Sequence, residues 1–317
     1  MSTPDTQEHE TLASAPDTQE HEMITHATGF ADPTQDFVLA GGRTIGYGLY
    51  GADDGPLVVV LDGPGSRGLG RAMAIPAVQL GIKLLVPDRP GYGRSTPTPR
   101  RSFAELASDL LVLVDRLGFR RFGIVAQSGG TPYALALASG AGDRATGLAF
   151  VGGLAPLHER HALADVAGPV RTVFLLARRA PWLLRPLVSG LARQNAKDPE
   201  AVARKFAKSV PPADRLVLED PTFWAIHATS SAEIMSRPAA FARETRMLVR
   251  PWRVDYDLVT APVALWVGEL DRTHPPTMSR RLAKLLGGAP VTVVPGAATF
   301  AMLTAFPDVL RHAAALP

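Results

Sequence analysis

Short apolar runs separated by glycine-rich turns mark the chain from residue 57 onward. They are rich in β-branched residues and almost continuous in apolar character, and they occupy residues 57–62, 82–86, 122–126, 147–153, 262–268 and 290–294. Continuous apolar runs of this length are typical of strands that are covered on both faces in a parallel sheet. We therefore expect these six segments to form the centre of one sheet.

Segments with helical spacing alternate with these runs. In the clearest one, Ser102 and Glu105 have the spacing of a capping box, leucines follow on one stripe, and Gly118 ends the pattern. Further helices are expected over 278–286 and at the end of the chain. Residues 37–51 read as a hairpin turning at Gly41-Gly42. Together these elements predict an α/β fold with a doubly wound, mostly parallel sheet of about eight strands.

The strand pattern stops between residues 154 and 260. This stretch is rich in Ala, Leu, Arg and Pro at helical spacing, so we expect a helical cap inserted between core segments 36–153 and 261–317. Sheets of this class bind ligands beyond the carboxyl ends of their strands, which is where the cap should lie. Residues 1–35 are polar and acidic, and the segment PDTQEHE occurs twice in them. That composition predicts a disordered tail.

Composition and charge exclude several classes of protein. There is no cysteine, so disulfides and thiolate metal sites are excluded. No apolar run of about 18 residues and no basic leader occurs, which predicts a cytoplasmic protein with no membrane partner. Residues 1–36 hold eight acidic and no basic residues, leaving 22 acidic residues against 33 Lys and Arg. The arginines are scattered rather than grouped with aromatic residues, so no nucleic-acid partner is expected.

The segment FGIVAQSGGTPYALALAS (122–139) predicts a strand, a sharp turn at Ser128 and a helix. Such a turn strains the backbone of its central residue, so the residues two positions away must have almost no side chain. Ala126 and Gly130 meet this demand. The backbone N–H of Gly129 would then point at a carbonyl oxygen that the serine attacks. The pattern is that of a nucleophile elbow, with Ala in place of the usual first Gly.

Four motifs in order resemble the α/β-hydrolase superfamily over residues 36–317. They are LDGPGSR at 61–67, the loop 88–95, the elbow, and GELD at 268–271 followed by two prolines. The resemblance implies an α/β-hydrolase fold with a cap, in which Asp271 orients and steadies a catalytic histidine. It also implies an oxyanion hole made by the backbone N–H groups of Gly63 and Gly129. No cofactor is implied.

Two further motifs depart from the family pattern. The family motif Pro-Gly-x-Gly-His after the last strand reads PGAAT here, so Thr299 stands where the catalytic histidine is usual. A serine hydroxyl without a neighbouring base is a poor nucleophile. In the first turn, Leu61 and Asp62 replace the usual His-Gly. Asp62 either adds negative charge beside the oxyanion hole or pairs with Arg67.

His274, in the loop after Asp271, is the first candidate for a relocated base. His158, His161 and His227 rank behind it, because histidines on polar segments usually serve no catalytic role. The spacing of His158 and His161 does not fit a helical zinc motif, and no third ligand accompanies them, so no metal site is expected.

Three hypotheses follow. The first is a non-hydrolytic enzyme, a cyclase, lyase or isomerase, acting on a small apolar carbonyl compound such as an ester, lactone or polyketide. The second is an ester or lactone hydrolase that uses His274, and the third is a silent ligand-binding pseudohydrolase. Catalysis would rest on Ser128, Asp271, Thr299 and His274, and substrate contacts on Asp62, Gln127, Trp224 and Phe300. The sequence leaves open whether the protein is a monomer or a homodimer.

Overall fold

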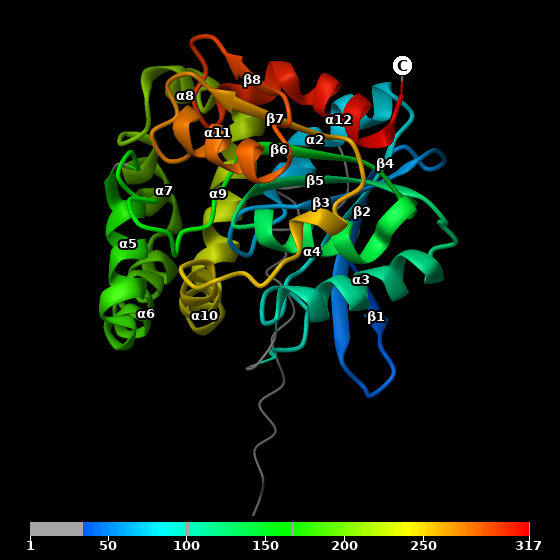
Figure 1. Ribbon diagram of the computed structural model, residues 1–317. Helices are drawn as coiled ribbons and strands as arrows, with labels where there is room; N and C mark the ends of the chain where they lie inside the picture. Colours follow the sequence, from blue (N-terminus) through cyan, green and yellow to red (C-terminus); the bar gives the residue numbers. More distant parts are fainter. Residues whose placement is uncertain (1–33, 99–101, 167, 317) are drawn as a thin grey trace, which may run out of the picture.

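The computed structural model describes residues 34–98, 102–166 and 168–316. Its centre is one sheet in the order β1-β2-β4-β3-β5-β6-β7-β8 (Figure 1). The pairs β1–β2 and β2–β4 are antiparallel, and all other neighbours are parallel. The strands are Thr34–Val38, Thr44–Gly51, Leu57–Leu61, Lys83–Pro87, Phe122–Ser128, Ala145–Gly153, Val263–Gly268 and Val291–Val294. The expected eight-stranded, mostly parallel sheet is confirmed.

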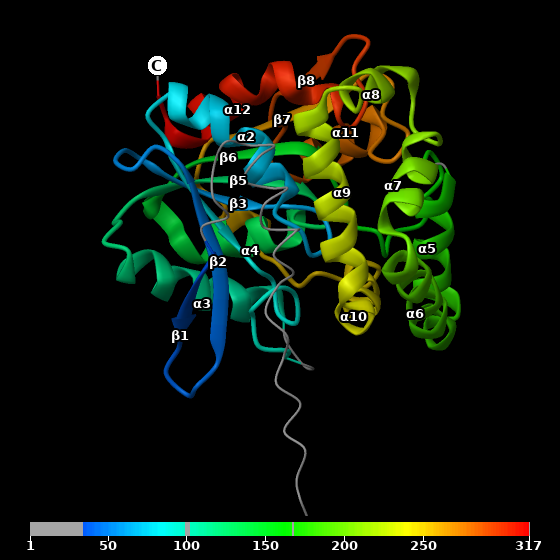
Figure 2. The same cartoon turned by 180° about the vertical axis from the view of Figure 1, so that it is seen from behind.

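The apolar runs form the strands because both faces of the sheet are covered. β3 (Leu57–Leu61) is buried along its whole length. One face packs against α3 (Phe103–Arg116), α4 (Thr131–Ala141) and α11 (Pro276–Leu285), and the other against α2 (Gly68–Gln79) and α12 (Phe306–Ala314) (Figures 1 and 2). In the described residues, three short 3₁₀ helices lie between these elements, at Gly142–Arg144, Tyr256–Leu258 and Ala301–Ala305.

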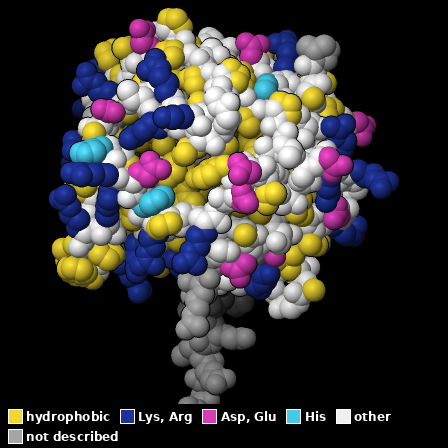
Figure 3. Space-filling model, viewed as in Figure 1, with side chains coloured by type: hydrophobic (Ala, Val, Ile, Leu, Met, Phe, Trp, Pro, Cys, Tyr) yellow, Lys and Arg dark blue, Asp and Glu magenta, His cyan; other side chains and the backbone are white. Residues whose placement is uncertain are grey.

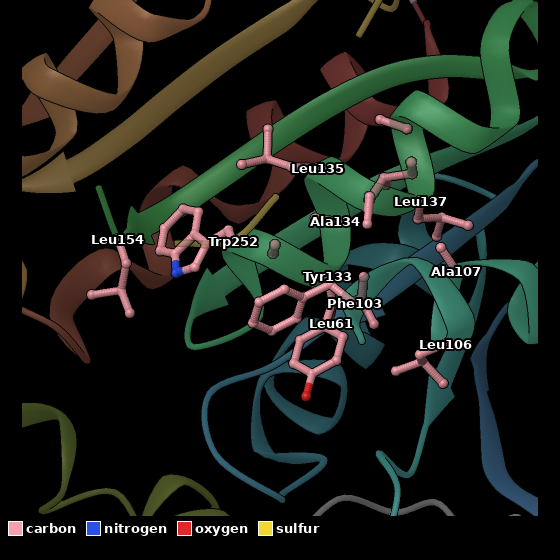
Figure 4. Packing of buried hydrophobic residues seen from close by; sticks show 14 of the residues in the cluster. Leu61, Phe103, Leu106, Ala107, Tyr133, Ala134, Leu135, Leu137, Leu154 and Trp252 are labelled. Carbon is pink, nitrogen blue, oxygen red and sulfur yellow. The ribbon is translucent and has the colours of Figure 1, made fainter. Parts of the chain in front are cut away.

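Local signals in the sequence fix the start of α3. The Ser102 hydroxyl accepts the N–H of Glu105, and the Glu105 carboxylate accepts the N–H of Ser102 at 2.6 Å, which is the predicted capping box. Phe103 then packs edge-to-face on Tyr133 of α4, with ring centroids 4.8 Å apart (Figure 4). This contact ties the helix after β4 to the helix after the elbow.

Between β6 and β7 the described chain is helical, and we call this segment the helical insertion. It contains α5 to α10, with bounds Gly168–Arg179, Pro181–Lys197, Pro199–Ala207, Pro212–Val217, Pro221–Ser236 and Pro238–Leu248. Five of these helices begin with proline. Proline is tolerated there because the N–H that it lacks would have no hydrogen-bond partner in the first turn of a helix. The helices stack to one side of the sheet (Figure 1).

The insertion is joined to the core by an apolar cluster and by polar contacts. Leu184 of α6 and Leu248 of α10 belong to the same buried cluster as Leu61 and Tyr133 of the core. The predicted disordered tail falls almost wholly on residues 1–33, outside the described residues. Its expected end was slightly wrong, because β1 begins at Thr34 and pairs there with Gly48 of β2.

Candidate active site

The turn after β5 has the geometry of a nucleophile elbow. Ser128 has a φ of 47°, in the left-handed region that residues with a side chain rarely adopt. Gly130 is required, because a Cβ added there would lie 1.9 Å from the carbonyl oxygen of Leu61. The N–H of Gly130 donates to the carbonyl of Gln127 at 2.8 Å and closes the turn. Ser128 therefore stands at the carboxyl edge of the sheet, partly exposed.

The turn after β3 lies beside Ser128, and the carboxylate of Asp62 in this turn binds the N–H of Gly63. A Cβ added at Gly63 would lie 3.8 Å from the Ser128 Cβ. The N–H of Gly63 donates to the Asp62 Oδ1 at 2.5 Å, while the Asp62 Oδ2 accepts from the Ser66 hydroxyl and the Leu69 N–H at 2.8 and 2.9 Å. One of the two expected oxyanion donors is thus engaged inside the turn. The other, the N–H of Gly129, has no hydrogen-bond acceptor among the described residues.

The alternative pairing of Asp62 with Arg67 was wrong. Arg67 Nε and Nη2 instead donate to the two carboxylate oxygens of Asp88, both at 2.8 Å. This bidentate pair is buried and fixes the loop after β4 against the start of α2. Asp62 consequently acts within its own turn, where it caps the N-terminus of α2.

A buried arginine that the sequence analysis did not single out supports the same turn. Arg89 donates to the backbone carbonyls of Asp62 and Gly63, and its Nε lies 2.7 Å from the Glu244 carboxylate of α10. The Tyr92 hydroxyl also donates to Glu244, at 3.1 Å, and burial together with this carboxylate raises the pKa of Tyr92 well above its ordinary value. The buried ion pair between Arg89 and Glu244 links the turn after β3 to the helical insertion. A small cavity lined by Tyr92, Tyr133 and Glu244 lies beside this pair.

The loop after β7 contains an acid and a histidine that are already paired. Asp271 Oδ1 accepts the backbone N–H groups of Thr273 and His274, both at 2.8 Å, and Oδ2 lies 3.2 Å from the His274 Nδ1. Both side chains are buried. Burial acts to raise the pKa of Asp271, but the charge of His274 and hydrogen bonds from His274 and Thr299 outweigh it, so the pKa is lowered. The carboxylate is therefore held in its ionised form.

Among the described residues, the second ring nitrogen of His274 has no hydrogen-bond partner. Because an ionised Asp271 can only accept, Nδ1 carries the proton in the neutral ring and Nε2 is an acceptor. Nε2 is buried and has no hydrogen bond among the described residues. The ring lies against the end of β6, since a Cβ added at Gly152 would lie 3.2 Å from it, and the next residue, Gly153, pairs with Ser128. No hydrogen bond joins the ring to Ser128.

The loop after β8 contains Thr299 and is bound by a residue of the helical insertion. The backbone N–H groups of Thr299, Phe300 and Ala301 donate to the Asp214 carboxylate of α8 at 3.1, 2.6 and 2.9 Å. Asp214 is 1% exposed. Burial and the charge of Asp271 raise the pKa of Asp214, and the three N–H donors lower it. The net effect is a raised pKa. Asp214 was missed from the sequence, because nothing in a helical insertion marks one aspartate as the partner of a distant loop.

The predicted substrate residues lie in two places. Gln127 is half-buried at the end of β5, next to the elbow. Trp224 and Phe300 both pack on the buried ring of His227, with centroids 5.8 and 5.4 Å away, and Phe206 stacks on the same ring at 5.3 Å. Burial lowers the pKa of His227. These residues form an aromatic cluster where α7 and α9 meet the loop after β8.

The other two candidate histidines lie at the start of the insertion, and they do not form a metal centre. His161 is exposed and His158 half-buried. Within residues 34–98, 102–166 and 168–316, no group of three or more His, Asp and Glu is placed to hold a metal ion. In the same residues, no helix has both the length and the apolar character needed to cross a membrane.

Comparison with known proteins agrees with this geometry. Residues 56–306 match the model of the α/β hydrolase fold family, so the chain belongs to that family. Three similar solved structures are a hydrolase from Pseudomonas aeruginosa PA01, a thermophilic esterase from Thermogutta terrifontis and the enol-lactonase from Burkholderia xenovorans LB400. Their TM-scores are 0.61, 0.63 and 0.61 and their identities 18%, 19% and 16%. They cover 88%, 88% and 87% of this chain, which covers 97%, 96% and 98% of theirs. At these identities the likeness shows the fold.

One curated relative matches a shorter stretch. The magnesium-chelatase 30 kDa subunit of Rhodobacter capsulatus is 34% identical over 90 residues, which are 28% of this chain and 32% of that subunit. The match thus spans about a third of the length of that relative.

Proposed function

We propose that the protein hydrolyses a small apolar ester or lactone, with Ser128 as nucleophile and His274 as its base. One observation carries the proposal: a buried His274 has Nδ1 fixed on an ionised aspartate and leaves Nε2 as a buried acceptor without a partner. An imidazole held in this way is the arrangement that takes a proton from a hydroxyl nucleophile. The aromatic cluster around His227 and the similarity in fold to an esterase and an enol-lactonase support an apolar carbonyl substrate.

In the first half of the proposed reaction, Ser128 Oγ attacks the substrate carbonyl carbon and its proton passes to His274 Nε2. The tetrahedral oxyanion accepts a hydrogen bond from the N–H of Gly129. When the C–O bond breaks, His274 returns the proton to the leaving alkoxide, and an acyl-serine remains. In the second half, His274 takes a proton from a water molecule whose oxygen attacks the acyl carbon. The bond to Ser128 Oγ then breaks, His274 returns the proton to Ser128, and the acid is released. Proton transfer needs Ser128 and His274 within about 3.2 Å, a distance that often closes only with substrate bound.

The test is active-site labelling together with hydrolysis. A fluorophosphonate should label the wild-type protein at Ser128, and p-nitrophenyl acetate and butyrate should be cleaved. Ser128→Ala should abolish labelling and lower kcat by about 10³-fold or more. Ser108→Ala is the matched control, since Ser108 lies on the exposed side of α3 and bonds only the carbonyl of Ala104. Labelling and hydrolysis that persist in Ser128→Ala would contradict the proposal.

A non-hydrolytic reaction is the second candidate, and Asp62 favours it. A carboxylate hydrogen-bonded to the Gly63 N–H puts negative charge where acyl transfer develops an oxyanion. In a cyclase, lyase or isomerase, this carboxylate would move a proton instead. Asp62→Ala separates the two reactions. Freeing the N–H should raise ester hydrolysis by about tenfold, because one such donor is worth about 10²–10³ and a loosened turn loses part of that. If Asp62 is a base, the substitution should abolish turnover.

A further inference from the structure

Helix α6 exposes an apolar ridge on the outside of the helical insertion. Leu183, Leu187 and Leu191 recur at every fourth residue, so they lie along one line of the helix, and their side chains are 49%, 44% and 46% exposed. Trp182 stands beside the ridge and is 71% exposed. Leu184 and Val188 of the same helix are fully buried, so the ridge is not needed for packing. A contiguous row of large apolar side chains in water indicates an interaction surface.

The charged side chains of α5 and α6 themselves have one sign. Residues 166–197 contain no Asp or Glu and six bases, namely Arg171, Arg178, Arg179, Arg185, Arg193 and Lys197. All six are exposed, and within the described part of the chain none forms an ion pair with an acidic side chain. Figure 3 shows Lys and Arg side chains along the edge where Figure 1 places α5 and α6, with apolar side chains at its lower corner. The partner of this edge is therefore both apolar and anionic.

We propose that the edge formed by α5 and α6 docks on an anionic lipid surface. A helix with Trp and Leu on one side and Arg around them lies in the interface between headgroups and acyl chains. Each base near an anionic bilayer strengthens the binding. A second copy of this chain would set six bases against six bases, and a nucleic acid would leave the leucines in water. Residues 1–33 carry seven acidic residues but offer few apolar side chains to cover the ridge.

The docking is not a membrane span, but it departs from the sequence-based expectation of no membrane partner. α6 packs on α10, whose Leu248 side chain would lie 3.3 Å from a Cβ added at Gly129. A protein docked through α6 would thus hold the elbow close to lipid, where apolar carbonyl compounds partition. The proposal does not depend on the reaction at Ser128, because vesicle binding is measured without turnover.

Flotation of the full chain with vesicles tests the proposal. Vesicles of phosphatidylcholine mixed with phosphatidylglycerol should bind the protein at low salt, and vesicles of phosphatidylcholine alone should bind it about tenfold less or not at all. The double variants Trp182→Ser/Leu187→Ser and Arg185→Glu/Arg193→Glu should each lower binding to anionic vesicles by about tenfold or more. The matched control is Val112→Ser/Arg120→Glu, which changes one exposed apolar and one exposed basic residue on or next to α3.

Three results would overturn the proposal. The full chain could fail to float with anionic vesicles, or the α6 variants could bind as well as the control. Alternatively, sedimentation could show a dimer that Trp182→Ser/Leu187→Ser dissociates, with no vesicle binding by the wild type, which would assign the ridge to a second copy of the chain. Circular dichroism and thermal unfolding of each variant confirm that the substitutions on this outer edge leave the fold intact.

Discussion

The loops after β7 and β8 reach the same edge of the sheet but are stabilised in opposite ways. The loop after β7 is held by its own residues, because Asp271 binds two backbone N–H groups and the ring of His274 within three residues. The loop after β8 has no titratable side chain between Pro295 and Phe300 and is held by Asp214 of the insertion. One loop holds the proposed acid and base, and the other serves as a contact between insertion and core.

This difference shows which feature of the site the fold constrains. In this account the fold fixes the position of the aspartate after β7. An imidazole can pair with that carboxylate from more than one nearby backbone position. In this chain the pairing spans three residues, and the hydroxyl of Thr299 also contributes a hydrogen bond to Asp271. Under the proposed assignment, the acid and the imidazole both come from the loop after β7.

Asp271→Asn should have the largest effect on this arrangement. The amide no longer fixes the proton on Nδ1 of His274, so the ring can present the wrong tautomer to Ser128. We expect kcat/KM for p-nitrophenyl butyrate to fall by about 10³–10⁴-fold. Glu269→Gln is the control in the same loop, because Glu269 is exposed and binds only the N–H of Gly296. An activity of Asp271→Asn equal to that of this control would show that the paired loop is not the catalytic one.

Thr299→His tests whether the loop after β8 still positions a base. Since Asp271 Oδ2 is already occupied by His274, a second imidazole should gain little, and we expect kcat/KM to change by less than about tenfold. Thr299→Val, which removes one hydrogen bond of about 1 kcal/mol, should lower it by about fivefold. A rise of about a hundredfold in Thr299→His that survives His274→Ala would return the catalytic role to the loop after β8.

The two buried aspartates should affect stability with opposite pH dependence. The folded-state pKa of Asp271 lies below its ordinary value of 3.8, so its contribution is present above that pH and is lost as pH falls through the folded pKa. The folded-state pKa of Asp214 lies above 3.8, so its contribution is present below that pH and is lost as pH rises through the folded pKa.

Urea unfolding at a series of pH values measures both contributions. The free energy of unfolding of the wild type relative to Asp271→Asn should increase with pH below 3.8. The same quantity relative to Asp214→Asn should decrease with pH above 3.8. Equal slopes for both variants would mean that the two loops are not held in different ways.

The sequence predicted those features that depend on local pattern. The buried strands, the capping box at Ser102 and the small residues around Ser128 each follow from the spacing of residue types, and the structure confirms them. The replacement of the family histidine by Thr299 stays a prediction, made from a motif that is contiguous in the sequence. His274 emerged as a candidate only because it stands three residues from Asp271.

The contacts that the sequence did not predict join segments far apart in the chain. Asp214 binds a loop 85 to 87 residues away, and Arg89 binds Glu244 across 155 residues. Such pairs depend on how the insertion packs, and an Ala-, Leu- and Arg-rich sequence does not specify that packing. The engagement of the Gly63 N–H by Asp62 was missed for another reason. The side chain of Asp62 can point either toward the N-terminus of α2 or toward Arg67, and the sequence does not distinguish these two directions.

The rate of Ser128 labelling in His274→Ala tests the central claim most directly. With a fluorophosphonate in excess, labelling measures the nucleophilicity of the serine without any assumption about the natural substrate. If His274 is the base, His274→Ala should label about 10²–10⁴-fold more slowly than the wild type, while Thr299→Val stays within tenfold of it. Labelling of His274→Ala at the wild-type rate would contradict the account, because Ser128 would then be activated by another group.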